Sequence, residues 1–70
     1  MFEYQMLIDN IREAIETAGY KQKAIAERIG KTPQEFSNMM NNRTNVTVID
    51  VYNISRALGV SPDTLYRVRS

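Results

Sequence analysis

The polar side chains best suited to recognition chemistry fall in one short stretch, residues 32–43, and most of them are amides. Gln34 and Asn38 are four residues apart, as are Ser37 and Asn41, so in a helix they share one polar stripe. Each amide offers an acceptor and donors side by side. The whole chain contains no His and no Cys, which excludes disulfides, the usual zinc ligand sets and the commonest general base. These residues therefore indicate recognition by hydrogen bonding, and we expect no enzyme activity.

Clear start and stop signals bound a helix predicted over residues 33–41. Thr32, Pro33 and Glu35 form a capping box, with the threonine as N-cap and the proline at the first helical position. Asn42 tolerates a left-handed backbone and can end the helix. Three apolar residues at helical spacing face the other way: Phe36, Met39 and Met40.

A shorter helix is predicted just before it, over residues 22–29. Ile25 and Ile29 are its large apolar residues, although Lys21 is a poor N-cap. Gly30 permits the positive φ that a sharp turn between helices needs. Two short helices joined in this way are the layout of a helix-turn-helix, whose second helix enters the DNA major groove. We expect the helix-turn-helix core to span residues 21–42.

The remaining residues must position this pair of helices. Apolar periodicity predicts helices over 3–18 and 48–58, and Ser61 with Pro62 starts another that continues toward the terminus. The expected fold is all-α, with five helices around one core and residues 1–70 forming a single domain. The expected buried face of the fourth helix is Val48, Val51, Ile54, Ala57 and Leu58; Tyr20 and Tyr52 are expected to be partly buried.

Charge is segregated along the chain, although the net charge is only +1. Residues 1–20 hold four acids and one base, a net −3; residues 21–43 hold five bases and two acids, a net +3. A cationic helix-turn-helix suits a phosphate-facing surface. No apolar run is long enough to span a membrane and the N-terminus is not a signal peptide, so a cytoplasmic protein is expected.

At this point the pattern resembles the Cro/C1-type (XRE-like) helix-turn-helix family of phage and bacterial repressors, whose domains are lambda-repressor-like. The residues that carry the resemblance span helices two to five: Gln22, Ile25, Ala26, Gly30, Thr32, Phe36, Ser37, Ala57, Leu58, Gly59 and Leu65. One departure is informative. Many members pair an Arg late in the first helix with a Glu late in the third, where this chain has Ile15 and Met40. The ion pair is expected to be replaced by an apolar contact.

The resemblance implies which residues would touch double-stranded DNA. The exposed start of the third helix would face base edges, which Gln and Asn can bind bidentately at adenine: Pro33, Gln34, Ser37 and Asn38. Flanking groups would contact phosphates: Gln22, Lys23, Thr32, Asn41, Arg43 and Asn45. A homodimer is implied through an apolar C-terminal patch of Val60, Tyr66 and Val68, with Arg67 and Arg69 beside it. No cofactor, metal or small-molecule ligand is indicated.

These features favour a sequence-specific transcriptional regulator, a repressor that occupies a palindromic operator as a dimer. The antitoxin of a toxin–antitoxin pair is an alternative with the same fold. A protein-interaction module that has lost DNA binding is another, which the near-neutral net charge favours. The chain is either a complete minimal regulator or one domain of a longer one.

Overall fold

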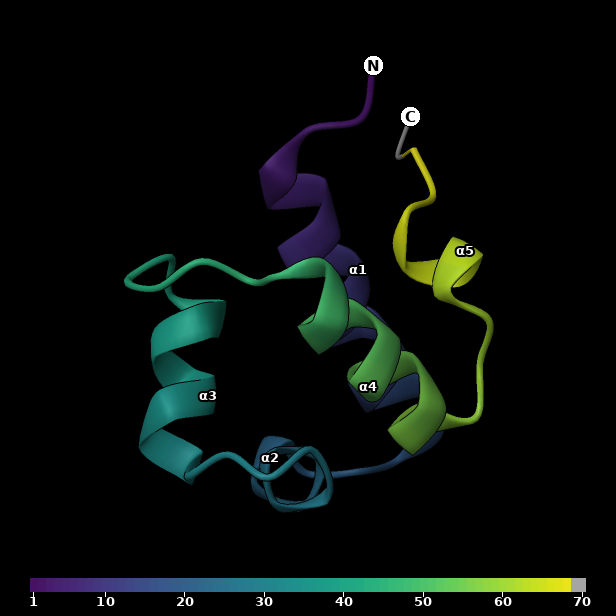
Figure 1. Ribbon diagram of the computed structural model, residues 1–70. Helices are drawn as coiled ribbons and strands as arrows, with labels where there is room; N and C mark the ends of the chain where they lie inside the picture. Colours follow the sequence, from purple (N-terminus) through teal and green to yellow (C-terminus); the bar gives the residue numbers. More distant parts are fainter. Residues whose placement is uncertain (69–70) are drawn as a thin grey trace.

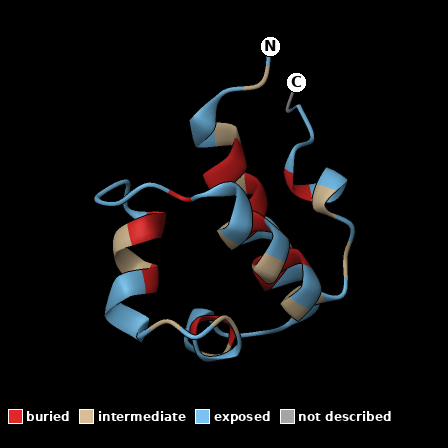
Figure 2. Ribbon diagram, in the orientation of Figure 1, coloured by how far each residue is buried: buried red, intermediate tan, exposed pale blue. Residues whose placement is uncertain are grey.

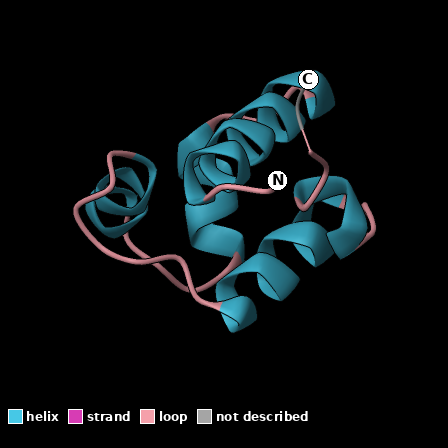
Figure 3. Cartoon of the chain, turned by 90° about the horizontal axis from the view of Figure 1, so that it is seen from above, coloured by secondary structure: helices cyan, strands magenta, loops and turns pink. Residues whose placement is uncertain are grey.

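Short helices and short connections build the whole molecule. The computed structural model describes residues 1–68, which form α1 (Tyr4–Ala18), α2 (Gln22–Arg28), α3 (Pro33–Met40), α4 (Val48–Leu58) and α5 (Pro62–Leu65). Figure 1 shows α4 crossing in front of α1, with α5 on one side of them and α3 on the other. Seen from above, α3 lies at one side of the molecule, where two loops join it to the other helices (Figure 3), and it packs against α2. The described residues thus form the expected all-α fold, and no helix among them is long and apolar enough to cross a bilayer.

The helix boundaries follow the local signals closely. α4 has the predicted bounds, and α1, α2 and α3 each differ from the prediction by one residue at one end. The prediction that the last helix continues toward the terminus was wrong, because α5 ends at Leu65. The physical reason lies in α1: the Asn10 side chain donates to the carbonyls of Leu65 and Arg67, at 3.0 and 2.8 Å. These carbonyls are thereby satisfied without a further helical turn.

Positive φ angles occur where the sequence predicted them around α3. Gly30, in the turn before α3, has φ 76°, and Asn42, just after it, has φ 62°. The turn at Gly30 and the end of α3 near Asn42 are therefore confirmed. Because glycine lacks a Cβ atom, the positive φ of Gly30 causes no steric strain. Asparagine, as at position 42, is one of the few other residues that adopt this conformation readily.

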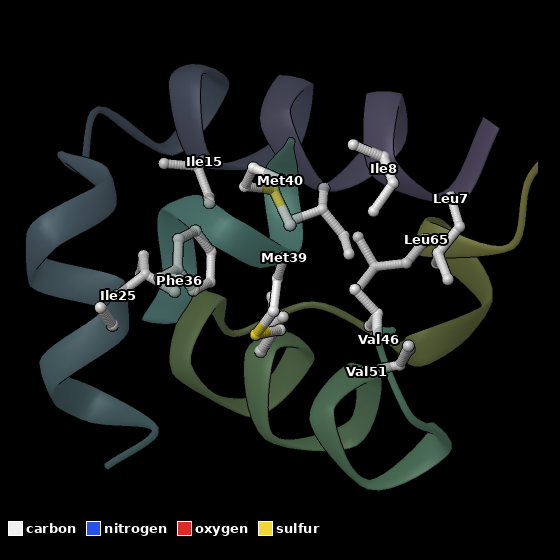
Figure 4. Packing of buried hydrophobic residues seen from close by; sticks show 13 residues of the cluster. Leu7, Ile8, Ile15, Ile25, Phe36, Met39, Met40, Val46, Val51 and Leu65 are labelled. Atoms are coloured by element: carbon white, nitrogen blue, oxygen red, sulfur yellow. The ribbon is translucent and has the colours of Figure 1, made fainter. Parts of the chain in front are cut away.

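One apolar core joins the five helices of residues 1–68. Figure 4 shows Phe36 of α3 beside Ile25 of α2, and Met40 beneath α1. Ile15 and Met40 are both buried in this cluster, as expected where the family carries an ion pair. The buried apolar residues are Leu7, Ile8, Ile11, Ile15, Ile25, Ala26, Phe36, Met39, Met40, Val46, Val51, Ile54 and Leu65.

Three aromatic and aliphatic residues lie outside this core, against expectation. Val48 is 78% exposed because it is the first residue of α4, and Val46, just before the N-cap, takes the buried position instead. Tyr20 and Tyr52 are also exposed rather than partly buried. Each of their rings lies under an arginine guanidinium, Arg28 and Arg56 respectively. Packing against charged side chains thus takes the place of burial for both rings.

Candidate nucleic-acid interface

The capping box and the buried face of α3 decide which of its residues reach solvent. The Thr32 hydroxyl accepts from the Glu35 backbone N–H at 3.1 Å, and the Glu35 carboxylate accepts from the Thr32 N–H at 2.8 Å. This reciprocal pair fixes where the helix starts. Phe36, Met39 and Met40 are at most 2% exposed. Figure 2 shows the resulting arrangement, in which the buried side of α3 faces the other helices and the opposite side is open.

The polar residues of α3 are organised in two hydrogen-bonded pairs. Gln34 donates its Nε2 to Asn38 Oδ1 at 3.0 Å. Asn41 donates its Nδ2 to the Ser37 carbonyl at 2.9 Å and to the Ser37 hydroxyl at 3.2 Å. The first pair leaves the Gln34 oxygen and the Asn38 NH₂ group with hydrogen-bonding capacity, an acceptor and a donor on one exposed face.

The end of α3 and the loop that follows it are bonded to α1 at three points. The Val46 N–H donates to the Tyr4 hydroxyl at 2.7 Å, and Asn42 Nδ2 donates to Gln5 Oε1 at 2.9 Å. Arg12 donates to the Met40 carbonyl at 2.8 Å, at the C-terminal end of α3. These contacts hold the segment 41–47, which carries three of the predicted phosphate contacts. Sequence reasoning missed all three positioning residues of α1, because partners 28 to 42 residues away leave no local signal.

A cleft of about 420 Å³ separates α3 from the start of α4. It is lined by Asn38 and Asn45, so the structure brings together a predicted base contact and a predicted phosphate contact. Ile49 also lines it and is 71% exposed. Ile49 was not among the predicted site residues, although its place in the first turn of α4, outside the apolar periodicity of that helix, is a signal that could have identified it.

The other predicted contacts lie on α2, on α3 and in the segments next to α3. Pro33, Thr32 and Arg43 are exposed at the start of α3 and in the loop that follows it. Gln22 and Lys23 are exposed in the first turn of α2. Among residues 1–68, the lining of the cleft includes neither of these two α2 residues, so they form a separate part of the candidate surface.

Two charged side chains near the start of α3, Lys31 and Glu35, have partners within the domain. Lys31 Nζ lies 3.7 Å from Asp50 Oδ1, which links the turn before α3 to the first turn of α4. The backbone N–H of Thr32, which donates to the Glu35 carboxylate, lowers the pKa of Glu35, and the Thr32 side chain and the charge of Lys31 lower it further. Glu35 is therefore ionised at neutral pH and engaged with its own helix.

Only part of the predicted C-terminal dimer patch is exposed to solvent. Tyr66 packs edge-on against Phe2, with 5.7 Å between the ring centroids, and Val60 is half-buried. Val68 is 54% exposed. Arg67 pairs with Glu13 of α1 at 3.2 Å, whereas Arg69 lies outside the described residues.

A short helix with a buried apolar side and an exposed amide side, set against a second helix across a glycine turn, defines a helix-turn-helix DNA-binding domain. Comparison with known proteins agrees. A helix-turn-helix family profile matches residues 11–65. An XRE-family-like protein from Pseudomonas syringae pv. tomato is 34% identical, with a TM-score of 0.80 over 89% of this chain and 76% of that one. This chain belongs to the XRE-like helix-turn-helix family, a class of DNA-binding transcription regulators.

A second solved structure shares the fold. The restriction-modification controller protein C.AhdI from Aeromonas hydrophila superposes with a TM-score of 0.78 at 20% identity, over 86% of this chain and 87% of that one. The search of curated proteins gave no match. At this level of identity, the second likeness supports the five-helix arrangement alone.

Proposed function

We propose that this protein is a transcriptional repressor that binds a palindromic operator as a homodimer, with α3 in the major groove. The observation that carries the proposal is the exposed face of α3, where Gln34 and Asn38 lie side by side opposite a fully buried face. Amide side chains suit bidentate contact with adenine. Pro33 and Ser37 complete the proposed base-reading set.

Phosphate contacts would orient the domain on the duplex. We assign them to the exposed residues that flank the reading face: Gln22, Lys23, Thr32, Asn41, Arg43 and Asn45. The fastening of the segment 41–47 to α1 supports this assignment, because a loop that is already ordered loses little entropy on binding. Asn41 would have to exchange its bonds to Ser37 for a phosphate contact.

Dimerisation is proposed through the patch of Val60, Tyr66 and Val68. A twofold dimer would present two copies of α3 about 34 Å apart, matching half-sites one helical turn apart. One domain of this size makes too few phosphate contacts for strong binding alone. The exposure of Val68 favours this patch. We place the action of this repressor in the cytoplasm.

The decisive experiment is selection of bound duplexes from a random DNA pool, at low and then at moderate salt. Recovery of a palindrome whose sequence preference is relaxed by Gln34→Ala and by Asn38→Ala is the expected result. Absence of enrichment at both salt concentrations would refute the regulator proposal for this chain. A non-palindromic site would retain the DNA-binding function and refute the dimer.

An antitoxin role and a protein-interaction role use the same fold. An antitoxin would bind DNA as proposed here and a toxin as well. An interaction module without DNA binding would show no salt-dependent affinity for duplexes, because a phosphate-contacting protein must lose affinity as salt rises. The segregation of positive charge onto residues 21–43 favours DNA binding over this last alternative.

A further inference from the structure

Two arginines line one pocket that contains none of the proposed DNA contacts. Arg28 of α2 and Arg56 of α4 line a shallow pocket of about 430 Å³ together with Asn53, Ile29 and Ala57. The ion pairs of residues 1–68 involve Lys31 and Arg67, so neither pocket arginine is paired with a carboxylate in this part of the chain. None of the residues that line the pocket is a proposed DNA contact.

Both guanidinium groups are already held in place. Arg28 lies over the Tyr20 ring, 4.6 Å from its centroid, and donates to the Ala57 carbonyl at 3.1 Å. Arg56 lies 5.7 Å from the Tyr52 ring centroid and donates to the Tyr52 hydroxyl at 3.1 Å. Within residues 1–68 these bonds use only the Nη1 atoms. The remaining N–H groups of each arginine form the planar fork that binds carboxylates bidentately.

An apolar strip continues from this pocket along the outer side of α4. Tyr52, Ile49 and Val48 lie within one helical turn of one another and are 49%, 71% and 78% exposed. Large apolar side chains exposed together mark interaction surfaces. Tyrosine and arginine are also the residue types that most often dominate binding energy at protein interfaces.

We propose that this surface binds an acidic segment of another protein. Arg28 and Arg56 would hold its Asp or Glu carboxylates, while Tyr52, Ile49 and Val48 would contact its apolar side chains. Neither arginine has a carboxylate partner within residues 1–68, so the positive charge of the pocket is complementary to the negative charge of an acidic segment. The inference uses none of the residues proposed as DNA contacts, and Ile49 is the one residue of this surface that also lines the cleft between α3 and α4.

A second copy of this chain fits the surface less well. The exposed acids Glu13 and Glu16 lie on α1, whose exposed large apolar residue is Tyr4 at the other end of the helix. Its exposed apolar residues near the C-terminus, Tyr66 and Val68, lie near one exposed acid, Asp63, and beside Arg67, which has the same charge as the pocket. Because the pocket offers two arginines, we assign to another protein an occupant that brings an acid to each of them together with apolar side chains.

The test is selection of binders from a displayed library of random 16-residue peptides, with the full chain immobilised. The Arg28→Gln/Arg56→Gln double variant serves for counter-selection. We expect enriched peptides with two or more acids next to Leu, Phe or Trp, and at least tenfold weaker binding to Arg56→Gln. Arg56→Lys, which keeps the charge but loses the fork, should recover only part of that loss. Circular dichroism melts establish that each variant is folded.

Arg43→Gln is the matched control for the peptide measurement. It should weaken DNA binding without changing peptide affinity, whereas the double variant should do the reverse. The proposal is overturned by a selection that yields no peptide able to discriminate the double variant, or by enriched peptides without acids. A loss of DNA affinity in the double variant equal to that of Arg43→Gln would instead make the arginines phosphate contacts. Self-association abolished by Tyr52→Glu would assign the surface to a second copy.

Discussion

Two neighbouring amides dominate the candidate reading face at the level of single residues. Because Gln34 donates to Asn38, each side chain restrains the other before any ligand arrives. A restrained pair loses less conformational entropy on binding than two free side chains. Removal of one amide would therefore disturb the other. The two positions should act as one unit rather than as independent contacts.

We predict non-additive effects for Gln34→Ala and Asn38→Ala on binding to the selected operator. Each single variant should lose about 1–3 kcal/mol of discrimination against a mismatched site. The double-mutant cycle should show a coupling free energy of about 0.5–3 kcal/mol, measured from dissociation constants at one salt concentration. Asn53→Ala, an amide on α4, is the control and should leave DNA affinity unchanged. Additivity within about 0.3 kcal/mol would contradict the coupling.

Capping boxes define the starts of two helices at the level of secondary structure. α3 begins with Thr32 and Glu35, and α4 begins with Thr47 and Asp50, each pair exchanging two hydrogen bonds. The two boxes are chemically alike, yet only Thr32 belongs to the proposed DNA surface. This pair of helices therefore allows a stability role to be separated from a binding role.

We expect Thr32→Ala and Thr47→Ala each to lower the free energy of unfolding by about 0.5–2 kcal/mol, because each removes a side-chain cap. Urea denaturation measures this loss. In duplex titrations, Thr32→Ala should also weaken DNA binding, whereas Thr47→Ala should not at temperatures where both variants are folded. Equal effects of both variants on DNA affinity would remove Thr32 from the set of phosphate contacts.

The capping box of α3 should also respond to acid. Its hydrogen bonds lower the pKa of Glu35 below its ordinary value of 4.5. Because the folded state favours the ionised form, this stabilisation is fully present above that ordinary pKa and is lost as pH falls through the lower folded pKa. The difference in free energy of unfolding between wild type and Glu35→Gln should therefore be constant near neutrality and shift below pH 4.5. A difference that stays constant throughout acid titration would show that the carboxylate makes no such contribution.

A buried hydrogen-bonding side chain of α1, Asn10, links the first helix to the C-terminal part of the described chain. Asn10 is 2% exposed, and its amide binds the carbonyls of Leu65 and Arg67. This contact joins the first helix to the segment after the last one, across 55 and 57 residues of chain. It also holds the region proposed for dimerisation against α1.

Asn10→Ala should lower the free energy of unfolding by about 1–3 kcal/mol, since the carbonyls of Leu65 and Arg67 lose their buried amide donor. Thermal and urea denaturation of the whole chain measure the effect. Asn45→Ala, an exposed asparagine, should change stability by less than about 0.5 kcal/mol. An equal loss for both variants would mean that the buried amide contributes nothing specific.

Local chemistry by itself determined helices α1 to α4, the turn at Gly30 and the family of this protein. The box at Thr32, the glycine turn and the apolar spacing of α3 act over a few residues, so they can be read directly from the sequence. Only the tertiary structure decided how the proposed site is supported. The contacts of Tyr4, Gln5 and Arg12 with the loop after α3, and the pairing of Asn10 with the C-terminal segment, join residues that are distant in the chain. Such contacts depend on how the helices pack, and side-chain spacing along one helix carries no information about them.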